Sequence, residues 1–178
     1  MRGLDHPIAT RDTIARVSQR QEQKLVEGRD RGVIRHASSV YGASLEGVPL
    51  TVFLPETGTA EIIVLAAIHG DESETTVAVS EGLRCIPHGD LEAAVILCGN
   101  PDGMLRGTRG NARGVDLNRN FPTSNWSPDA VCYKSRANDA RDIALSPGAS
   151  PASEPETIAL IALIDKLGPR ALGRLHPA

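Results

Sequence analysis

A histidine and a glutamate stand three residues apart at His69 and Glu72, directly after the apolar run Glu61–Ile68. An imidazole nitrogen and a carboxylate oxygen are both zinc ligands, and His-x-x-Glu in a turn can aim the two atoms at one ion. None of the other four histidines has an acidic residue three positions further on. The competing interpretation is the start of a helix, where acidic side chains are favoured without any metal. The spacing indicates a metal site but does not by itself separate the two interpretations.

The long polar segment Gly99–Trp126 has no hydrophobic period, and a loop of that length inside a compact domain is usually functional. It opens with Asn100-Pro101-Asp102-Gly103, a sequence typical of a tight turn. It carries three arginines, a residue type that can hold a carboxylate through two parallel hydrogen bonds: Arg106, Arg109 and Arg113. Two other interpretations stay open. One is a solvated loop in which Asp102 and Asp116 pair with two of the arginines, and the other is an arginine-rich segment that binds RNA.

These side chains need elements that hold them, and the apolar runs predict an α/β fold. Strands are predicted over three apolar segments: Leu50–Leu54, Glu61–Ile68 and Ala93–Cys98. Helices are predicted over Ser73–Leu83 and from Ser153, where SEPE fits a capping box, to Gly168. We therefore expect a mixed, mostly parallel sheet with crossover helices, whose carboxyl edge holds the ligand site.

Length and composition limit the possible functions. The 178 residues suffice for about one domain, which we place at residues 36–178, after a polar N-terminal arm over residues 1–35. The net charge of −3 and the few aromatic residues (one Trp, two Tyr, two Phe) disfavour a nucleic-acid partner. The longest apolar run, Ile62–Ile68, is too short to cross a membrane. The polar N-terminus without a signal sequence and the three scattered cysteines indicate a cytoplasmic protein. The oligomeric state stays open.

Three motifs in order resemble those of the zinc carboxypeptidase family: HGDE at His69–Glu72, NPDG at Asn100–Gly103 and GVDLNRNFP at Gly114–Pro122. The likeness runs from about Val40 to Ala178. Further stretches are similar to the murein tripeptide amidase branch of this family: Tyr41–Leu50, Thr108–Pro122 and Ser153–Thr157. Enzymes of that branch are cytoplasmic and cleave the γ-D-glutamyl–diaminopimelate bond of a small cell-wall peptide during recycling.

The resemblance implies a role for each of six residues. His69, Glu72 and His176 would hold the zinc ion, which activates water and acts as a Lewis acid on the carbonyl. Arg109 would polarise the scissile carbonyl and stabilise the oxyanion. Asn118 and Arg119 would grip the free carboxylate of the diaminopimelate.

The sequence departs from the family after His176. The family's general base is a glutamate on a strand well beyond the third zinc ligand, and only two residues follow His176 here. We therefore expect a truncated domain that lacks the last strands and helices and is inactive alone, since losing a general base typically costs ~10²–10⁴ in rate. The alternatives are a general zinc carboxypeptidase or deacylase on the same scaffold, or a non-catalytic remnant that binds zinc or peptide.

Overall fold

The computed structural model describes residues 25–135 and 141–175. Its main sheet has five strands, and their bounds in spatial order are β1 (Ser38–Ala43), β2 (Pro49–Phe53), β4 (Ala94–Ile96), β3 (Ile62–Leu65) and β7 (Ala171–Arg174). Strands β4, β3 and β7 run parallel, whereas β1 and β2 pair antiparallel with their neighbours. The predicted mixed α/β sheet with crossover helices is confirmed.

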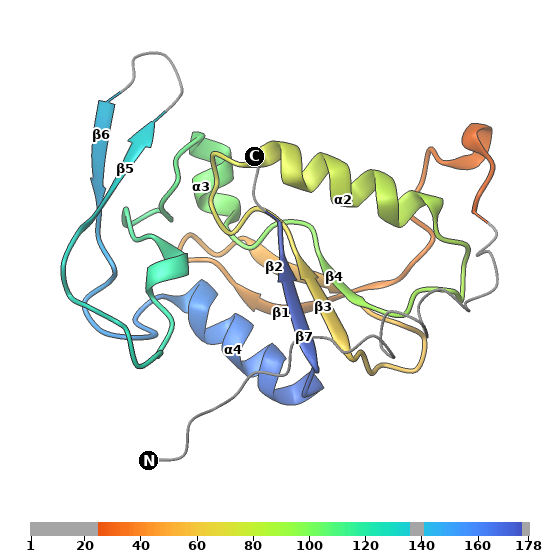
Figure 1. The fold of residues 1–178 in the computed structure, drawn as a ribbon. Helices are drawn as coiled ribbons and strands as arrows, with labels where there is room; N and C mark the ends of the chain where they lie inside the picture. The colour runs from red at the N-terminus through yellow and green to blue at the C-terminus, as the bar shows by residue number, and fades with distance from the viewer. Residues whose placement is uncertain (1–24, 136–140, 176–178) are drawn as a thin grey trace, which may run out of the picture.

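Helices cover both faces of this sheet (Figure 1): α2 (Ser73–Cys85) lies on one side and α4 (Pro155–Leu167) on the other. Alternate residues of β3 serve the two sides. Ile63 and Leu65 pack with the buried leucines of α4, whereas Val64 packs with Leu83 of α2. Because successive side chains of a strand point to opposite faces, a sheet covered on both sides needs an almost continuous apolar strand. That requirement explains the unbroken apolar sequence of β3.

The predicted strand Glu61–Ile68 is longer than the observed one. After Leu65 the chain leaves the sheet and stays buried, and Ala67 has a positive φ of 45°. The last apolar residues of the run therefore belong to a buried connection rather than to the strand. In α2, Val79 and Leu83 pack against the core, whereas Val77 is 58% exposed.

The turn predicted at Asn100–Gly103 is wrong, because these residues begin helix α3 (Pro101–Arg106). The Asn100 side chain accepts a hydrogen bond from the Gly103 backbone at 2.9 Å, and Pro101 occupies the first helical position. An asparagine cap followed by proline is a helix start as well as a turn sequence. The same segment also contains the 3₁₀ turn η2 (Leu117–Arg119), capped by Asp116.

The capping box predicted at Ser153 is also wrong. The N-cap of α4 is Glu154, and the Ser153 hydroxyl donates to the Glu154 carboxylate at 2.8 Å. Glu154 and Glu156 are buried and both accept from Asn111, at 2.9 and 3.2 Å. These glutamates tie the arginine-rich segment to α4, so neither is available to close a capping box.

The predicted N-terminal arm, residues 1–35, is only partly described, since residues 1–24 lie outside the described residues. Within the rest, η1 (Gly28–Asp30) follows Val26, whose backbone donates to Cys85 at 2.8 Å. Ile34 packs against the core on the α2 side. The described part of the arm therefore contacts the C-terminal end of α2.

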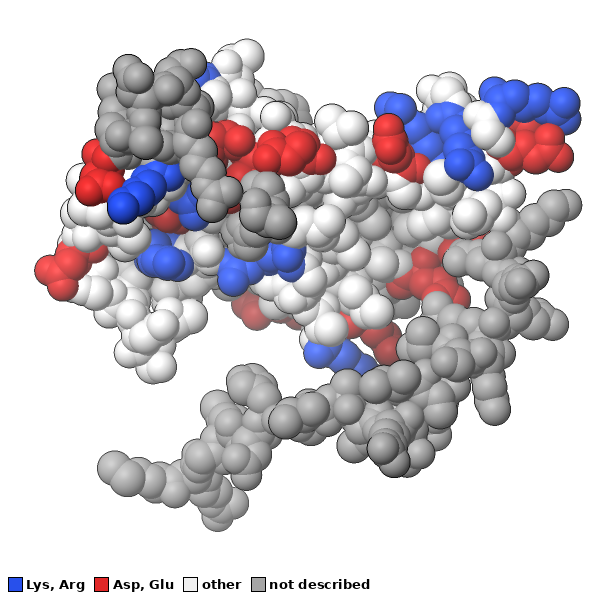
Figure 2. Space-filling view, turned by 45° about the horizontal axis from the view of Figure 1, so that its top comes forward, with Lys and Arg blue, Asp and Glu red and all other residues white. Residues whose placement is uncertain are grey.

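Charges are mixed on the surface. On the face shown in Figure 2, acidic and basic side chains lie next to one another. Among the helices in residues 25–135 and 141–175, none is long and apolar enough to cross a membrane.

Strand β7 pairs along one edge with β3, and in the described part of the chain its other edge has no strand partner. Leu172 on β7 and Ile62 on β3 are 42% and 48% exposed. An open edge with apolar neighbours is a template for pairing with another chain.

We expect Leu172→Lys to lower the self-associated fraction seen by sedimentation velocity, and Val33→Lys, at an exposed loop residue, to leave it unchanged. Equal association in both variants would contradict this role for the edge.

The thiol of Cys98, at the end of β4, behaves differently from that of Cys132. Burial raises the pKa of Cys98 to about 11, whereas Cys132 is exposed. At pH 8 we expect Cys98 to react with a thiol reagent about a hundredfold more slowly than Cys132, because the thiolate is the reactive form. Mass spectrometry of labelled peptides measures both rates, with urea-unfolded chain as the control in which they converge. Equal labelling rates of Cys98 and Cys132 in the folded chain would contradict this prediction.

The same pKa shift predicts how stability depends on pH. Since the unfolded thiol has a pKa of ~8.5, the folded chain should lose stability as the pH rises from there to about 11.

Candidate metal centre

His69 lies at the carboxyl end of β3 and its side chain is completely buried. The next residue, Gly70, passes so close to α3 that a Cβ there would clash with the backbone of Gly103. Its N–H donates to the Arg109 carbonyl at 3.4 Å. The glycine therefore brings the loop that carries His69 against two segments that are distant in sequence.

Glu72 stands at the N-cap of α2, and its Oε1 lies 2.8 Å from Nδ1 of His69. The glutamate is 6% exposed. Thr75 fixes this loop, because its hydroxyl donates to the Glu72 carbonyl at 2.7 Å and accepts from the Ala67 N–H at 3.0 Å. The structure thus brings the predicted histidine and glutamate together in a buried pair.

Asp116 faces the other ring nitrogen of His69, with Oδ1 3.2 Å from Nε2. Burial alone would raise the pKa of Asp116, but the hydrogen bond and charge of His69, the charge of Arg109 and the Asn118 N–H lower it, and the net shift is downward. A metal-binding histidine almost always gives its second nitrogen to such a carboxylate. Sequence reasoning missed this partner and considered Asp116 only for pairing with arginine.

Arg109 is the arginine that contacts this group. Its NH1 lies 3.1 Å from Glu72 Oε1, and its Nε lies 3.6 Å from Asp116 Oδ2. The other two arginines bind elsewhere: Arg106 pairs with Glu46, and Arg113 pairs with Glu154 at 3.2 Å. All three are paired with acids. Of the two aspartates considered from the sequence, Asp116 faces Arg109, whereas the Asp102 carboxylate accepts from the Ser44 hydroxyl and the Glu46 N–H. This pairing speaks against a segment that binds RNA phosphates.

Asn118 and Arg119 lie on η2, next to Asp116, whose Oδ1 accepts the Asn118 N–H at 2.9 Å. The Asn118 side-chain oxygen accepts from Arg174 of β7. These three residues line a cleft of about 800 Å³ together with Phe121, Trp126, Leu172 and others. Two guanidinium groups beside apolar walls form a place where a carboxylate can bind.

His176, the third ligand implied by the resemblance, lies outside the described residues. The chain just before it is described: the Leu175 N–H donates to the Leu65 carbonyl at 3.1 Å. That bond places the end of β7 beside the end of β3, the strand that leads to His69. Within the described residues, no cluster of three His, Cys, Asp or Glu side chains could hold a metal ion.

The donor atoms nevertheless fit zinc. One imidazole nitrogen and one carboxylate oxygen lie side by side, and the second imidazole nitrogen is held by a buried acid. Nitrogen and oxygen donors with a carboxylate behind the histidine are what a zinc site uses. His69 and Glu72 are therefore the residues that would hold the ion.

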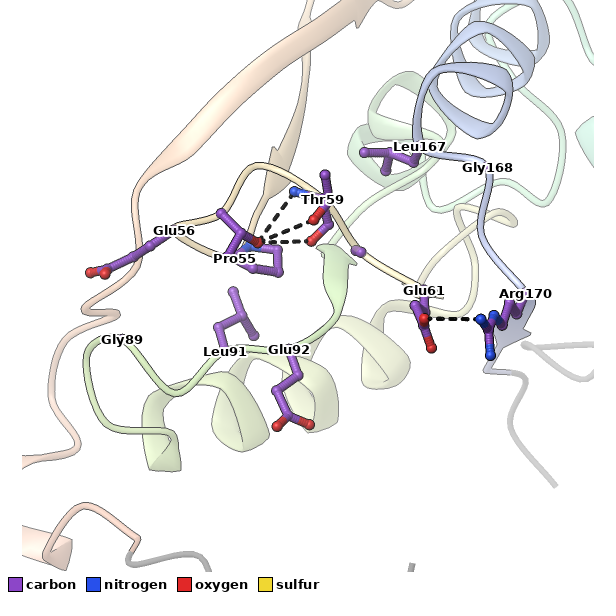
Figure 3. Close-up of a pocket in the computed structure, with 12 residues that line it drawn as sticks. Pro55, Glu56, Thr59, Glu61, Gly89, Leu91, Glu92, Leu167, Gly168 and Arg170 are labelled. Atoms are coloured by element: carbon purple, nitrogen blue, oxygen red, sulfur yellow. Dashed lines mark hydrogen bonds and ion pairs between the residues drawn. The ribbon is translucent and has the colours of Figure 1, made fainter. Parts of the chain in front are cut away.

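A second cleft, of about 610 Å³, lies at the opposite, amino ends of the parallel strands (Figure 3). Its charged residues include Glu61 and Arg170, which pair at 3.5 Å while more than two thirds of each side chain is exposed. Exposed pairs of this kind interact weakly. The buried ionisable groups thus gather at the carboxyl edge, where the sequence predicted the site, and not in this cleft.

Comparison with known proteins points to the same chemistry. Residues 90–177 match the family description of zinc carboxypeptidases. Murein peptide amidase A of Escherichia coli K12 is 41% identical over 149 residues, which are 83% of this chain and 62% of that protein. The chain therefore spans about three fifths of the length of this relative.

Solved structures agree with the fold. The crystal structure of the murein-tripeptide amidase MpaA from Escherichia coli O157 matches with a TM-score of 0.78 and 39% identity, covering 86% of this chain and 66% of that one. Carboxypeptidase A from Helicoverpa armigera matches with a TM-score of 0.58 and 21% identity, covering 82% and 41% of the two chains, and supports the fold alone. The ordered motifs, the fold and these relatives together show that the chain belongs to the zinc carboxypeptidase family.

Proposed function

We propose that the function of this chain is zinc-dependent hydrolysis of the γ-D-glutamyl–diaminopimelate amide bond of murein tripeptide. The observation that carries the proposal is the buried group in which His69 bonds Glu72 and Asp116 while Arg109 approaches both carboxylates. The identity of the substrate is proposed from the names of the relatives, which are murein peptide amidases. We also propose, from the motifs that resemble the murein tripeptide amidase branch, that the chain acts in cell-wall peptide recycling in the cytoplasm.

In this reaction His69, Glu72 and His176 would hold the metal. Zinc, when bound, supplies Lewis acidity for the carbonyl and for the attacking water. Asp116 keeps the His69 ring in one orientation through its Nε2. The remaining chemistry rests on the arginines.

Arg109 supplies a fixed positive charge at the site. It is held by two buried carboxylates, and its side chain is 20% exposed, so substrate can reach it. A cation that is already oriented stabilises the negative charge that develops on the carbonyl oxygen, without reorganising during the reaction. Arg109 therefore polarises the scissile carbonyl.

Asn118 and Arg119 grip the free carboxylate of the diaminopimelate. Arg174, which bonds Asn118 and lines the same cleft, joins them in this role. The sequence motifs did not single out Arg174, since it belongs to β7 and reaches η2 only through the sheet.

We further propose that these 178 residues alone bind the peptide but turn it over slowly. In the described part of the chain, the two carboxylates beside His69 already bond His69 and Arg109. A carboxylate held in this way is a poor general base for water, because its lone pairs and charge are engaged. A non-catalytic peptide-binding protein is the limiting case of this proposal.

Zinc binding tests the metal site directly. We expect the chain to bind one zinc ion in titration calorimetry, and His69→Ala and His176→Ala each to abolish tight binding. Asp116→Asn should weaken affinity by about 10- to 100-fold, as loss of a carboxylate behind a ligand does. His88→Ala is the matched control, since this histidine is exposed and far from the site. Failure of the wild-type chain to bind zinc, or an equal loss in His88→Ala, would refute the site.

Peptide hydrolysis tests the substrate. We expect the zinc-loaded chain to bind the γ-linked tripeptide, with turnover at least about a hundredfold below that of the Escherichia coli amidase. Arg119→Leu should weaken peptide binding, whereas Arg170→Leu, at an exposed arginine in the opposite cleft, should not. Turnover equal to that of the amidase would overturn the proposed slow turnover. Preference for ordinary α-linked peptides would replace the amidase by a general carboxypeptidase, and absence of binding would refute the peptide site.

A further inference from the structure

A tyrosine from the two-stranded sheet reaches the metal centre. Strands β5 (Val131–Ser135) and β6 (Arg141–Leu145) pair antiparallel and stand beside α3 in Figure 1. Tyr133 of β5 donates its hydroxyl to Asp71 Oδ2 at 2.8 Å. Its ring lies under the guanidinium of Arg109, with 4.8 Å between Cζ and the ring centroid. One side chain thus touches the loop between His69 and Glu72 and the arginine of the site.

Of the two carboxylates that hold Arg109, Glu72 accepts a hydrogen bond from NH1, and Asp116 attracts the guanidinium by charge. Among the described residues the buried Nε has no hydrogen-bond partner, and it lies 3.6 Å from Asp116 Oδ2. A guanidinium held at one nitrogen can still rotate about that bond. An aromatic face under the guanidinium plane removes this freedom, and the attraction strengthens where water is excluded.

The tyrosine is itself anchored. Its hydroxyl donates to Asp71 Oδ2, and in the part of the chain that the structure describes the buried Oδ1 of Asp71 has no hydrogen-bond partner, so this bond is a main polar contact of that carboxylate. The anchor lies in the loop that carries both proposed ligands, two residues after His69 and one before Glu72. The ring is therefore placed relative to the metal loop and not only relative to its own hairpin.

We propose that Tyr133 is a positioning residue that holds Arg109 in register with the metal centre. Its hydroxyl fixes the ring to the metal loop, and its ring fixes the plane of the guanidinium. The catalytic meaning of this register rests on the proposed function, in which Arg109 meets the carbonyl oxygen.

The arginine side chain can be observed without any turnover. In ¹⁵N NMR spectra of the full chain, we assign the Nε–H signal of Arg109 by its loss in Arg109→Lys. Tyr133→Leu should shift this signal and speed its exchange with water by roughly fivefold, the factor expected for a lost cation–π contact. Tyr133→Phe keeps the ring but loses the bond to Asp71, and should give a signal shift and an exchange rate between those of wild type and of Tyr133→Leu. Cys132→Leu introduces the same residue one position away, at an exposed site, and should change nothing.

A purely structural role of Tyr133 predicts a different result. Tyr133→Leu would then lower the melting temperature and leave the Arg109 signal unmoved, which would overturn the proposal. If Tyr133→Leu does not fold, the wild-type chain decides, because a nuclear Overhauser contact between the Tyr133 ring and the Arg109 Cδ protons must be present, and its absence overturns the proposal. Failure of the proposed function is distinguishable: a wild-type chain that binds no zinc refutes the metal site, while the NMR result still reports on Tyr133 and Arg109.

Discussion

The rest of the structure depends on the burial of His69 between two carboxylates. Both ring nitrogens face an acid, Glu72 at 2.8 Å and Asp116 at 3.2 Å, and all three side chains are shielded from water. Removing two carboxylates from water costs several kcal/mol each unless positive charge and hydrogen bonds compensate. Arg109 supplies that compensation from a third segment of the chain. The strand end, the helix start and the polar loop must therefore meet at one point, or none of these groups is satisfied.

Residues far from the metal centre hold that meeting point together. Asn111, two positions after Arg109, donates to both Glu154 and Glu156 at the start of α4, and Glu156 also accepts the Leu45 N–H at 2.9 Å. The arginine-bearing loop is thereby fixed to the helix below the sheet and to the turn after β1. A buried acid that loses a partner leaves an uncompensated charge. The segment Ser153–Thr157 thus stabilises the site through the arginine-bearing loop and not through direct contact with His69.

The sequence predicted the site's edge and its central pair, because both depend on local signals. An apolar run followed by His-x-x-Glu places His69 and Glu72 at the end of a strand whatever the rest of the chain does. Asp116 and Tyr133 could not be predicted this way, since their roles arise only when segments 47 and 62 residues away from His69 and Asp71 pack against them. The strand β7 was equally hard to predict, because ALGR is short and less apolar than a buried strand, and its pairing with β3 joins segments far apart in the sequence. Asn-Pro was ambiguous between turn and helix, and the buried contact at Gly70 favoured the helix.

The arginines have different roles because their acidic partners lie in different parts of the structure. Arg106 and Arg113 have acidic partners away from His69, so their ion pairs stabilise the position of the loop. Arg119 and Arg174 line a cleft whose apolar walls include Phe121, Trp126 and Leu172. Charge–charge attraction is stronger beside apolar surface than in open water. In the proposed reaction a substrate carboxylate therefore binds at η2 and β7, while Arg109 contacts the scissile carbonyl at the metal centre. Asp116 joins the two places, because one oxygen accepts from both the His69 ring and the Asn118 backbone. This one buried side chain therefore links the residues proposed to hold the metal to those proposed to bind the substrate carboxylate.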